Sequence, residues 1–369
     1  MKKSALILMS VLLAAFSLPM MSSAQGFPPV DISMFPAPTG PYQVGRVTRH
    51  WVDASRDEPL TEDTADQREL MVRIWYPAEV EAGTEFALMN VDLSGPSAAE
   101  LMSIFNLDSS DPVFQSFVNL RTYAYQDAPV SDEPSKYPVL VFSPGWASLP
   151  EEYSIQIEEL ASHGYLVVSI YHPYYSGATV FPDGRIVMPV PLQSTSQTEQ
   201  AITTCAQDIL FVLDQLESLN ASDLDGMFTG RLDLERIGVW GSSLGGASAI
   251  LSGTLDHRIR AVVDEDARMP AGYAPLEQPF MLFRATAAPI PSQVPNYTVS
   301  VRGFVHNSFG DWPVFMSGVG SIEGQRTVEI VRAFILTFFD KYLKGEDSGL
   351  LDGGSADYPE VEVRAQNTD

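Results

Sequence analysis

From Tyr137 onward, short apolar runs alternate with longer amphipathic stretches, and this alternation constrains the fold more than any other feature of the chain. Short apolar runs are typical of strands buried on both faces, and amphipathic stretches are typical of helices that cover a sheet. The order predicts an α/β fold with a mainly parallel central sheet and helices on both faces. Strands are expected at residues 139–142, 166–170, 237–240, 261–263, 280–283 and 297–301, and helices at residues 151–162, 198–219, 244–251 and 327–342.

An N-terminal strand pair is expected ahead of this region. Residues 42–52 and 70–76 alternate apolar and polar side chains, which indicates two antiparallel strands joined by a loop rich in Asp and Glu. The pattern loosens at residues 84–136, where apolar clusters at 101–105 and 114–120 suit two small helices. This segment is predicted to be either a lid or a plain surface insertion.

The first 24 residues have the pattern of a secretory signal peptide. Lys2 and Lys3 precede an apolar stretch, and the small residues up to Ala24 form a cleavage site. Cleavage after Ala24 predicts a periplasmic or secreted protein, and no later apolar run has the length of an integral membrane segment. The rest is expected to form a Pro-rich arm (residues 25–41), a main domain (42–345) and an acidic, Gly-rich surface tail (346–369).

The net charge limits the class of partner. The formal charge is -25, and a surface this acidic repels phosphate backbones, so nucleic acid is excluded as a partner. The chain has one cysteine, Cys205, which cannot form an internal disulfide. Its apolar neighbours in sequence predict a buried position on a helix rather than a reactive thiol.

A serine lies between glycines directly after an expected strand. Gly241, Ser243 and Gly245 fit the pattern G-x-S-x-G, and small residues follow where a helix must pack closely. In an α/β-hydrolase fold, this pattern is a sharp strand-to-helix turn that exposes the serine hydroxyl. The five-letter pattern also arises by chance, but the preceding apolar strand supplies the structural context that it requires. Ser243 is therefore the predicted nucleophile.

A serine hydroxyl needs a base, and in this fold the chain order is serine, acid, histidine. Two histidines follow Ser243, namely His257 and His306. His257 lies in a polar connection just after the elbow helix, whereas His306 follows the last expected strand, where the loop of the base belongs. His306 is the predicted base.

The acid should lie between Ser243 and His306, at the carboxyl end of a strand. No Asp or Glu occurs between Glu277 and Asp311, so the acid must come from the strand that ends near residue 263. Asp264 and Asp266 both follow that strand. Spacing alone does not choose between them.

The oxyanion of a tetrahedral intermediate needs backbone N–H donors. Leu244, the residue after the nucleophile, is the first expected donor. The second is expected from the turn after residues 139–142, where Pro144 has no N–H, and Trp146 is the predicted donor.

These motifs together resemble the plasma-type, or group VII, platelet-activating factor acetylhydrolases and their bacterial relatives among the dienelactone-hydrolase-like α/β hydrolases. The likeness runs from about residue 42 to 343, and its best-matching segments are residues 137–145, 160–164, 241–247, 266–269 and 301–306. In that family the Asp that precedes Ala is the triad acid, so the resemblance selects Asp266. It also implies a substrate class, phospholipids with a short sn-2 acyl chain.

Two departures from the family pattern change the wall of the expected pocket. The chain has Ser242 before the nucleophile and Pro144 in the oxyanion turn, where the family often has His. Three tyrosines that follow the strand at 166–170 could hold a choline group by cation–π contact, or could simply pack in the loop. They are Tyr171, Tyr174 and Tyr175.

The expected reaction is acyl transfer through an acyl-enzyme on Ser243, which requires no metal and no organic cofactor. The expected partner is a small-molecule ester or a phospholipid. Alternative activities are a general short-chain carboxylesterase, a polyester hydrolase and a dienelactone-type hydrolase. A non-catalytic binding protein on the same fold is a more remote alternative, because such a protein would be expected to lose Ser243 or His306.

Overall fold

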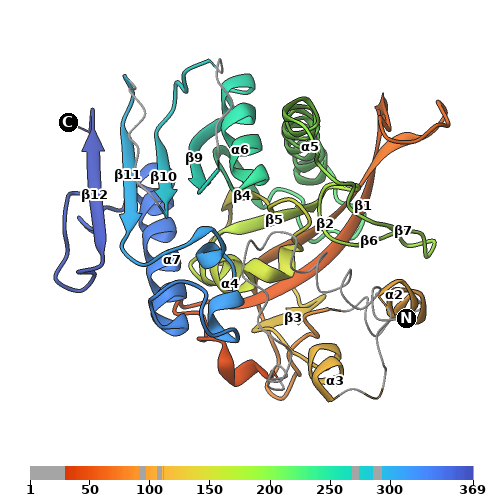
Figure 1. Ribbon diagram of the computed structural model, residues 1–369, viewed down its shortest axis with the longest axis horizontal. Coiled ribbons are helices and arrows are strands. Elements are labelled where there is room, and N and C mark those ends of the chain that lie inside the picture. Colours follow the sequence, from red (N-terminus) through yellow and green to blue (C-terminus); the bar gives the residue numbers. More distant parts are fainter. Residues whose placement is uncertain are drawn as a thin grey trace.

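The computed structural model describes residues 30–90, 97–105, 110, 112–267, 274–285 and 293–368, and a twisted sheet dominates them (Figure 1). Its strands are β1 (Gln43–Asp57), β2 (Gln67–Ala78), β3 (Ala124–Gln126), β4 (Tyr137–Ser143), β5 (Leu166–Tyr171), β8 (Leu232–Ser242), β9 (Ile259–Glu265), β10 (Phe280–Arg284), β11 (Asn296–Val301) and β12 (Val361–Gln366). The described helices are α2 (Ala98–Phe105), α3 (Pro112–Val118), α4 (Ser154–Ser162), α5 (Thr195–Ala221), α6 (Leu244–Leu255) and α7 (Gly324–Phe339). Short helical turns lie at η1 (Ile32–Met34), η3 (Pro150–Tyr153), η4 (His306–Phe309), η5 (Trp312–Val314) and η6 (Asp340–Lys344), and β6 (Thr179–Val180) and β7 (Ile186–Val187) form a small hairpin.

The strand order of the main sheet is β12-β11-β10-β9-β8-β4-β5-β2-β1-β3. The six strands from β11 to β5 run parallel to one another, β2 and β1 follow as an antiparallel pair, and β12 closes the other edge antiparallel to β11. The parallel centre, the crossover helices and the N-terminal strand pair confirm the fold class that the alternation predicts. All the strand ends that carry the candidate site point the same way because their strands are parallel.

The two faces of the sheet are buried by different helices. Val139 and Val141 of β4 pack in a core with α5 and α6, whereas Leu140 and Phe142 pack in a second core with α4 and α7. Successive side chains of a strand point to opposite faces, so a strand buried on both faces has an unbroken apolar sequence. This requirement explains why β4 was recognisable as a short apolar run.

The C-terminal segment differs from its expected form. Residues 346–369 are not simply a surface tail, because Val361–Gln366 form β12 and pair with the whole of β11, and Leu351 is fully buried. In β12 apolar side chains alternate with polar ones and most of them are exposed, as an edge strand tolerates. An apolar run was therefore absent, and the strand was missed.

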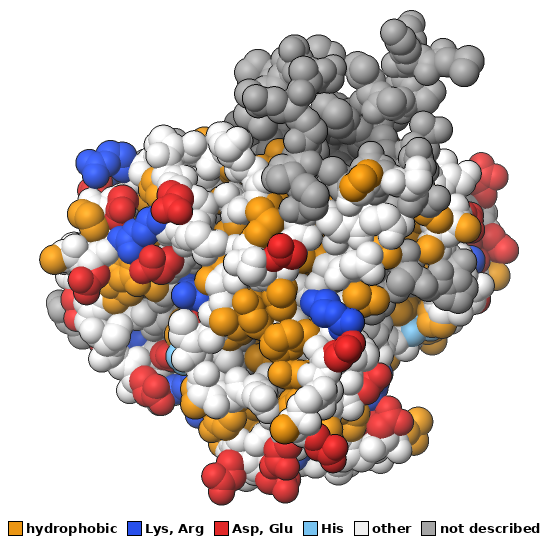
Figure 2. All heavy atoms as spheres, turned by 90° about the horizontal axis from the view of Figure 1, so that it is seen from below, with side chains coloured by type: hydrophobic (Ala, Val, Ile, Leu, Met, Phe, Trp, Pro, Cys, Tyr) orange, Lys and Arg blue, Asp and Glu red, His pale blue; other side chains and the backbone are white. Residues whose placement is uncertain are grey.

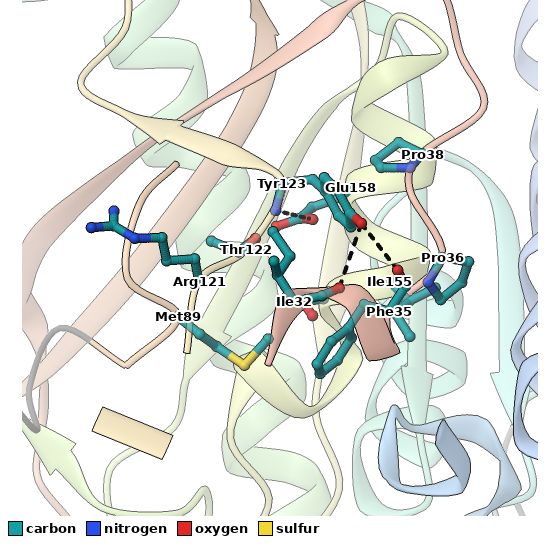
Figure 3. Close-up of a pocket in the computed structure, with 11 residues that line it drawn as sticks. Ile32, Phe35, Pro36, Pro38, Met89, Arg121, Thr122, Tyr123, Ile155 and Glu158 are labelled. Carbon is teal, nitrogen blue, oxygen red and sulfur yellow. Dashed lines mark hydrogen bonds between the residues drawn. The ribbon is translucent and has the colours of Figure 1, made fainter. Parts of the chain in front are cut away.

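The described residues of the arm and of the insertion pack against the main domain (Figure 3). Tyr123 connects the arm to α4, because its hydroxyl donates to the Phe35 carbonyl at 3.1 Å and its N–H donates to Glu158 Oε2 at 3.0 Å. A narrow crevice lined by arm residues and by Met89 and Arg121 lies beside these contacts. The described parts of the insertion are also joined to the sheet through β3, which pairs with β1.

Figure 2 shows the lower face of the molecule, where apolar side chains gather centrally and acidic side chains lie toward the rim. The expected signal peptide lies outside the described residues. Among the helices that the structure describes, none is long and apolar enough to span a bilayer.

Candidate active site

The predicted nucleophile elbow is a strained turn at the end of β8. Ser243 has φ 54° and ψ -115°, a backbone conformation that is unfavourable for a residue with a side chain, and α6 begins at the next residue. The Ser243 N–H donates to the Glu265 carbonyl at 2.9 Å, which holds the turn against β9. A Cβ atom on Gly245 would overlap the Ser143 carbonyl, and one on Gly241 would overlap the backbone of Gly245. The two glycines of the motif are thus required by close backbone contact.

His306 and Asp266 are brought together at the carboxyl end of the sheet. His306 Nδ1 lies 2.8 Å from Asp266 Oδ2, and the second carboxylate oxygen, Oδ1, accepts the Ala285 N–H at 3.0 Å. Asp266 itself has φ 57°, and its N–H donates to the Phe283 carbonyl at 2.9 Å. A carboxylate oxygen in this position favours the imidazole tautomer that carries its proton on Nδ1.

Asp264 has a different environment from Asp266. It is fully buried, its Oδ1 accepts the Ala267 N–H at 2.8 Å, and its Oδ2 lies 2.8 Å from Arg284 Nη2. Burial raises the pKa of Asp264 to about 6 despite the nearby guanidinium. These contacts place Asp264 beneath the turn that presents Asp266, and not against the imidazole.

Ser243 and Asp266 follow neighbouring strand ends. Ser242 is the register partner of Glu265 across the parallel β8–β9 pair, so the next residue of each strand lies at the same edge. Among the described residues, Ser243 makes no side-chain hydrogen bond with His306. His257, the other histidine after the elbow, is exposed and precedes β9, at the end of that strand opposite to Asp266.

The two expected oxyanion donors lie on either side of the elbow. Leu244 is the first residue of α6 and is buried, and Trp146 follows β4 with its indole N–H bonded to the Val190 carbonyl at 3.0 Å. Both side chains contact one small apolar cluster that also contains Ala267 and Cys205. In the described part of the chain, neither backbone N–H donates to a protein acceptor. Cys205 is buried, as the sequence predicts.

The three tyrosines at the end of β5 and in the turn after it are largely interior. Tyr171 is buried with its hydroxyl bonded to Glu151, and its ring lies 5.5 Å from the Arg73 guanidinium carbon. Tyr175 is also buried, and its ring lies 6.0 Å from the guanidinium carbon of Arg68. Only Tyr174 is half-exposed. The burial favours loop packing, the second of the two roles that the sequence left open.

One polar group near the site was missed by sequence reasoning. His172 Nε2 lies 2.9 Å from Ser143 Oγ, and its Nδ1 lies 2.8 Å from Asp208 Oδ2. The three residues come from β4, the turn after β5, and α5, so no spacing in the sequence could have joined them. Within the described ranges, no group of three or more His, Cys, Asp or Glu side chains is placed to hold a metal ion.

Comparison with known proteins gives the family context of this geometry. A family model described as platelet-activating factor acetylhydrolase, isoform II, matches residues 30–183. A probable 1-alkyl-2-acetylglycerophosphocholine esterase of Arthroderma benhamiae is 26% identical over 264 residues, which cover 61% of this chain and 65% of that relative. The platelet-activating factor acetylhydrolase of Bos taurus is 24% identical over 294 residues, which cover 63% and 66% respectively. The chain is thus similar to platelet-activating factor acetylhydrolases over a little more than 60% of its length.

This relationship confirms the resemblance predicted from the motifs. The alignments span just under two thirds of the length of these curated relatives, and the family model ends before the elbow. A ferulic acid esterase from Streptomyces cinnamoneus of known structure is 28% identical and has a TM-score of 0.72, covering 89% of this chain and 98% of that chain. The structural match identifies the fold as that of an α/β hydrolase.

Proposed function

We propose that the protein is a serine hydrolase that cleaves carboxylic esters, with Ser243 as nucleophile, His306 as base and Asp266 as acid. The observation that carries this proposal is the 2.8 Å contact between His306 Nδ1 and Asp266 Oδ2. A carboxylate at Nδ1 supports a base that accepts through Nε2, and Ser243 follows the end of the neighbouring strand in a strained turn. Leu244 and Trp146 provide the oxyanion N–H groups.

In this mechanism Ser243 attacks the ester carbonyl while His306 Nε2 removes the hydroxyl proton. The Asp266 carboxylate stabilises the imidazolium that forms, and the two N–H groups stabilise the charge on the carbonyl oxygen. His306 then protonates the leaving alcohol. A water molecule, activated by the same histidine, releases the acid from Ser243.

For the substrate we propose a phospholipid with a short sn-2 acyl chain, on the strength of the relatives named as acetylhydrolases and as an acetylglycerophosphocholine esterase. A second candidate is a general short-chain carboxylesterase. It is favoured by the ferulic acid esterase, because 98% of that chain is covered by the match.

The deciding experiment pairs an active-site probe with a substrate panel. A fluorophosphonate should label the wild-type protein and Ser242→Ala, its neighbouring control, but not Ser243→Ala. Labelling that persists in Ser243→Ala would refute the nucleophile. Hydrolysis rates for acetyl, butyryl and longer p-nitrophenyl esters, beside phospholipids with short and long sn-2 chains, then separate the two substrate classes.

We also propose that the protein is exported and that residues 1–24 are removed. This rests on the basic start, the apolar stretch and the small residues before Gln25. Mass spectrometry of the protein recovered outside the cytoplasm should find Gln25 as the first residue. An intact N-terminus on exported protein would contradict the cleavage site.

A further inference from the structure

A second serine–histidine–aspartate array lies behind the candidate site, entirely inside the protein. The side chains of Ser143, His172 and Asp208 are all essentially buried, and they are joined by contacts of 2.9 and 2.8 Å. Two guanidinium groups hold the carboxylate: Arg68 Nη2 lies 2.6 Å from Oδ2, and Arg56 Nη2 lies 2.9 Å from Oδ1. Because no member reaches the surface, this array cannot attack a substrate.

The direction of each hydrogen bond follows from the charges. The paired guanidinium of Arg68 holds the pKa of Asp208 well below its usual range, so the carboxylate is ionised and accepts. His172 therefore carries its proton on Nδ1, and burial lowers the pKa of its imidazole, so the ring is neutral. Its Nε2 can only accept, and Ser143 must donate its hydroxyl proton to it. The hydroxyl of Ser143 thus has one fixed orientation.

The array is attached to the loop that carries the proposed oxyanion donor. Ser143 ends β4, and Trp146 is three residues later. The turn after β5, which holds the histidine, is joined to this same loop by two backbone hydrogen bonds: Ala147 N–H to the Tyr175 carbonyl at 2.7 Å, and Gly177 N–H to the carbonyl of Ser148 at 2.9 Å. The strands β4 and β5 lie side by side (Figure 1). The loop is thereby held at Ser143, before the Trp146 N–H, and again at Ala147 and Ser148, after it.

The base of this loop, at Ser143, also contacts the elbow. The Ser143 carbonyl occupies the space that a Cβ atom on Gly245 would need, so the end of β4 and the start of α6 are in direct contact. A shift of Ser143 would therefore move the loop donor, Trp146 N–H, relative to the elbow donor, Leu244 N–H. Oxyanion stabilisation depends on both donors pointing at one position.

We propose that Ser143, His172 and Asp208 are positioning residues that fix the Trp146 N–H for stabilisation of the transition state. The proposal rests on the proposed ester hydrolysis. The array contacts no substrate, so its loss weakens the stabilisation of the oxyanion and leaves ground-state binding nearly unchanged. Such a change lowers kcat and leaves KM near its wild-type value.

The test compares two buried serines on neighbouring strands. Ser143→Ala removes the donor to His172, whereas Ser169→Ala on β5 removes a buried hydroxyl that has no hydrogen-bond partner among the described residues. Outright loss of an oxyanion donor costs about 10²- to 10³-fold in kcat, so a misplaced donor should cost roughly 10- to 100-fold. We expect that loss for Ser143→Ala, with wild-type kcat for Ser169→Ala.

Two further measurements distinguish positioning from general damage. A trifluoromethyl ketone that forms an adduct with Ser243 should bind Ser143→Ala more weakly by the same factor as kcat/KM falls. Amide hydrogen exchange should rise in residues 144–149 and stay unchanged in α6. His172→Gln, whose amide can still pair with Ser143, should retain more activity than His172→Leu.

Equal kcat and equal inhibitor affinity in Ser143→Ala and Ser169→Ala would overturn the proposal, as would a rise in KM at unchanged kcat. Failure of the proposed function has a different signature: wild-type hydrolysis no faster than that of Ser243→Ala. In that case the proposed role of the array in the reaction is refuted as well. Loop exchange in Ser143→Ala then reports whether the array fixes the loop at all, and unchanged exchange would overturn this part as well.

Discussion

His306 Nδ1 lies 2.8 Å from Asp266 Oδ2, and Asp266 reaches the imidazole from a backbone conformation with φ 57°. The turn that produces this conformation is held from below by Asp264, which binds the Ala267 N–H and pairs with Arg284. Two carboxylates that are two residues apart thus have separate tasks. One faces the histidine, and the other stabilises the turn.

Substitution of the two aspartates should separate these tasks. Asp266→Asn should lower kcat by about 10⁴-fold with the fold intact, because an amide favours the wrong imidazole tautomer. Asp264→Asn breaks a buried ion pair, so its free energy of unfolding should fall by roughly 3 to 5 kcal/mol, while the folded fraction keeps most of its kcat. Steady-state kinetics and urea denaturation at pH 8 measure both effects. A dead Asp264→Asn beside an active Asp266→Asn would reverse the assignment.

Gly245→Ala should abolish turnover. The added Cβ would overlap the Ser143 carbonyl, so β4 and α6 must move apart, and both proposed oxyanion donors are attached to them. Gly354→Ala is the matched control, since nothing lies within 4 Å of a Cβ there and the backbone φ is not positive. Circular dichroism and ester hydrolysis should show a folded, active control. Full activity in Gly245→Ala would mean that the elbow can relax without cost.

Acetyl esters should be cleaved faster than palmitoyl esters. This expectation derives from the family relationship, since the matched relatives are named for acetyl substrates. The measurement is kcat/KM across p-nitrophenyl esters at concentrations where all are monomeric. A rate that rises steadily with chain length would favour a lipase-like substrate instead.

The central fold was predictable because strands buried on both faces must be apolar throughout. β4, β5 and β9 could be located from their apolar runs, and the helices between them from their amphipathic period. The edge was less predictable. In β12 only Val361 is buried, Val363 is partly buried, and polar residues alternate with them, so this strand has no apolar run.

The candidate site was predictable to the extent that it is local. Ser243 has a motif, and chain order with the absence of other acids leads to His306 and to the pair Asp264 and Asp266. The contact between Ser143 and His172 is set by strand register and has no local pattern. Such partners can be found only when the sheet is assembled.

Stability should fall as the pH rises from about 5 to 8. Burial raises the pKa of Asp311 to about 7 and that of Glu158 to about 8, while Asp264 is raised to about 6. The folded state therefore keeps protons that the unfolded chain releases near pH 4. Since the unfolded state binds fewer protons in this window, the free energy of unfolding decreases with rising pH. Urea denaturation at pH 5.5, 7 and 8.5 should show this trend, and a rise in stability would contradict it.

The dependence of stability on the protonation of buried carboxyl groups can be tested at one position, Glu265. Its side chain is fully buried, and burial raises the pKa of its carboxyl group well above the usual range. The neutral acid is thus the form that the fold accommodates, and Glu265→Gln imitates it at every pH.

We expect the free energy of unfolding of Glu265→Gln to be close to that of wild type at pH 5.5 and higher than that of wild type at pH 8.5. At the higher pH, the wild-type protein must either retain a proton that the unfolded chain has released or bury a charged carboxylate, whereas the glutamine variant does neither. Each proton retained only by the folded state costs about 1.4 kcal/mol of stability per pH unit. Glu81→Gln, an exposed position, should leave the pH dependence unchanged. If Glu265→Gln and Glu81→Gln gave the same slope, Glu265 would be ionised in the folded protein, and a cation or water would have to accompany it beneath the elbow.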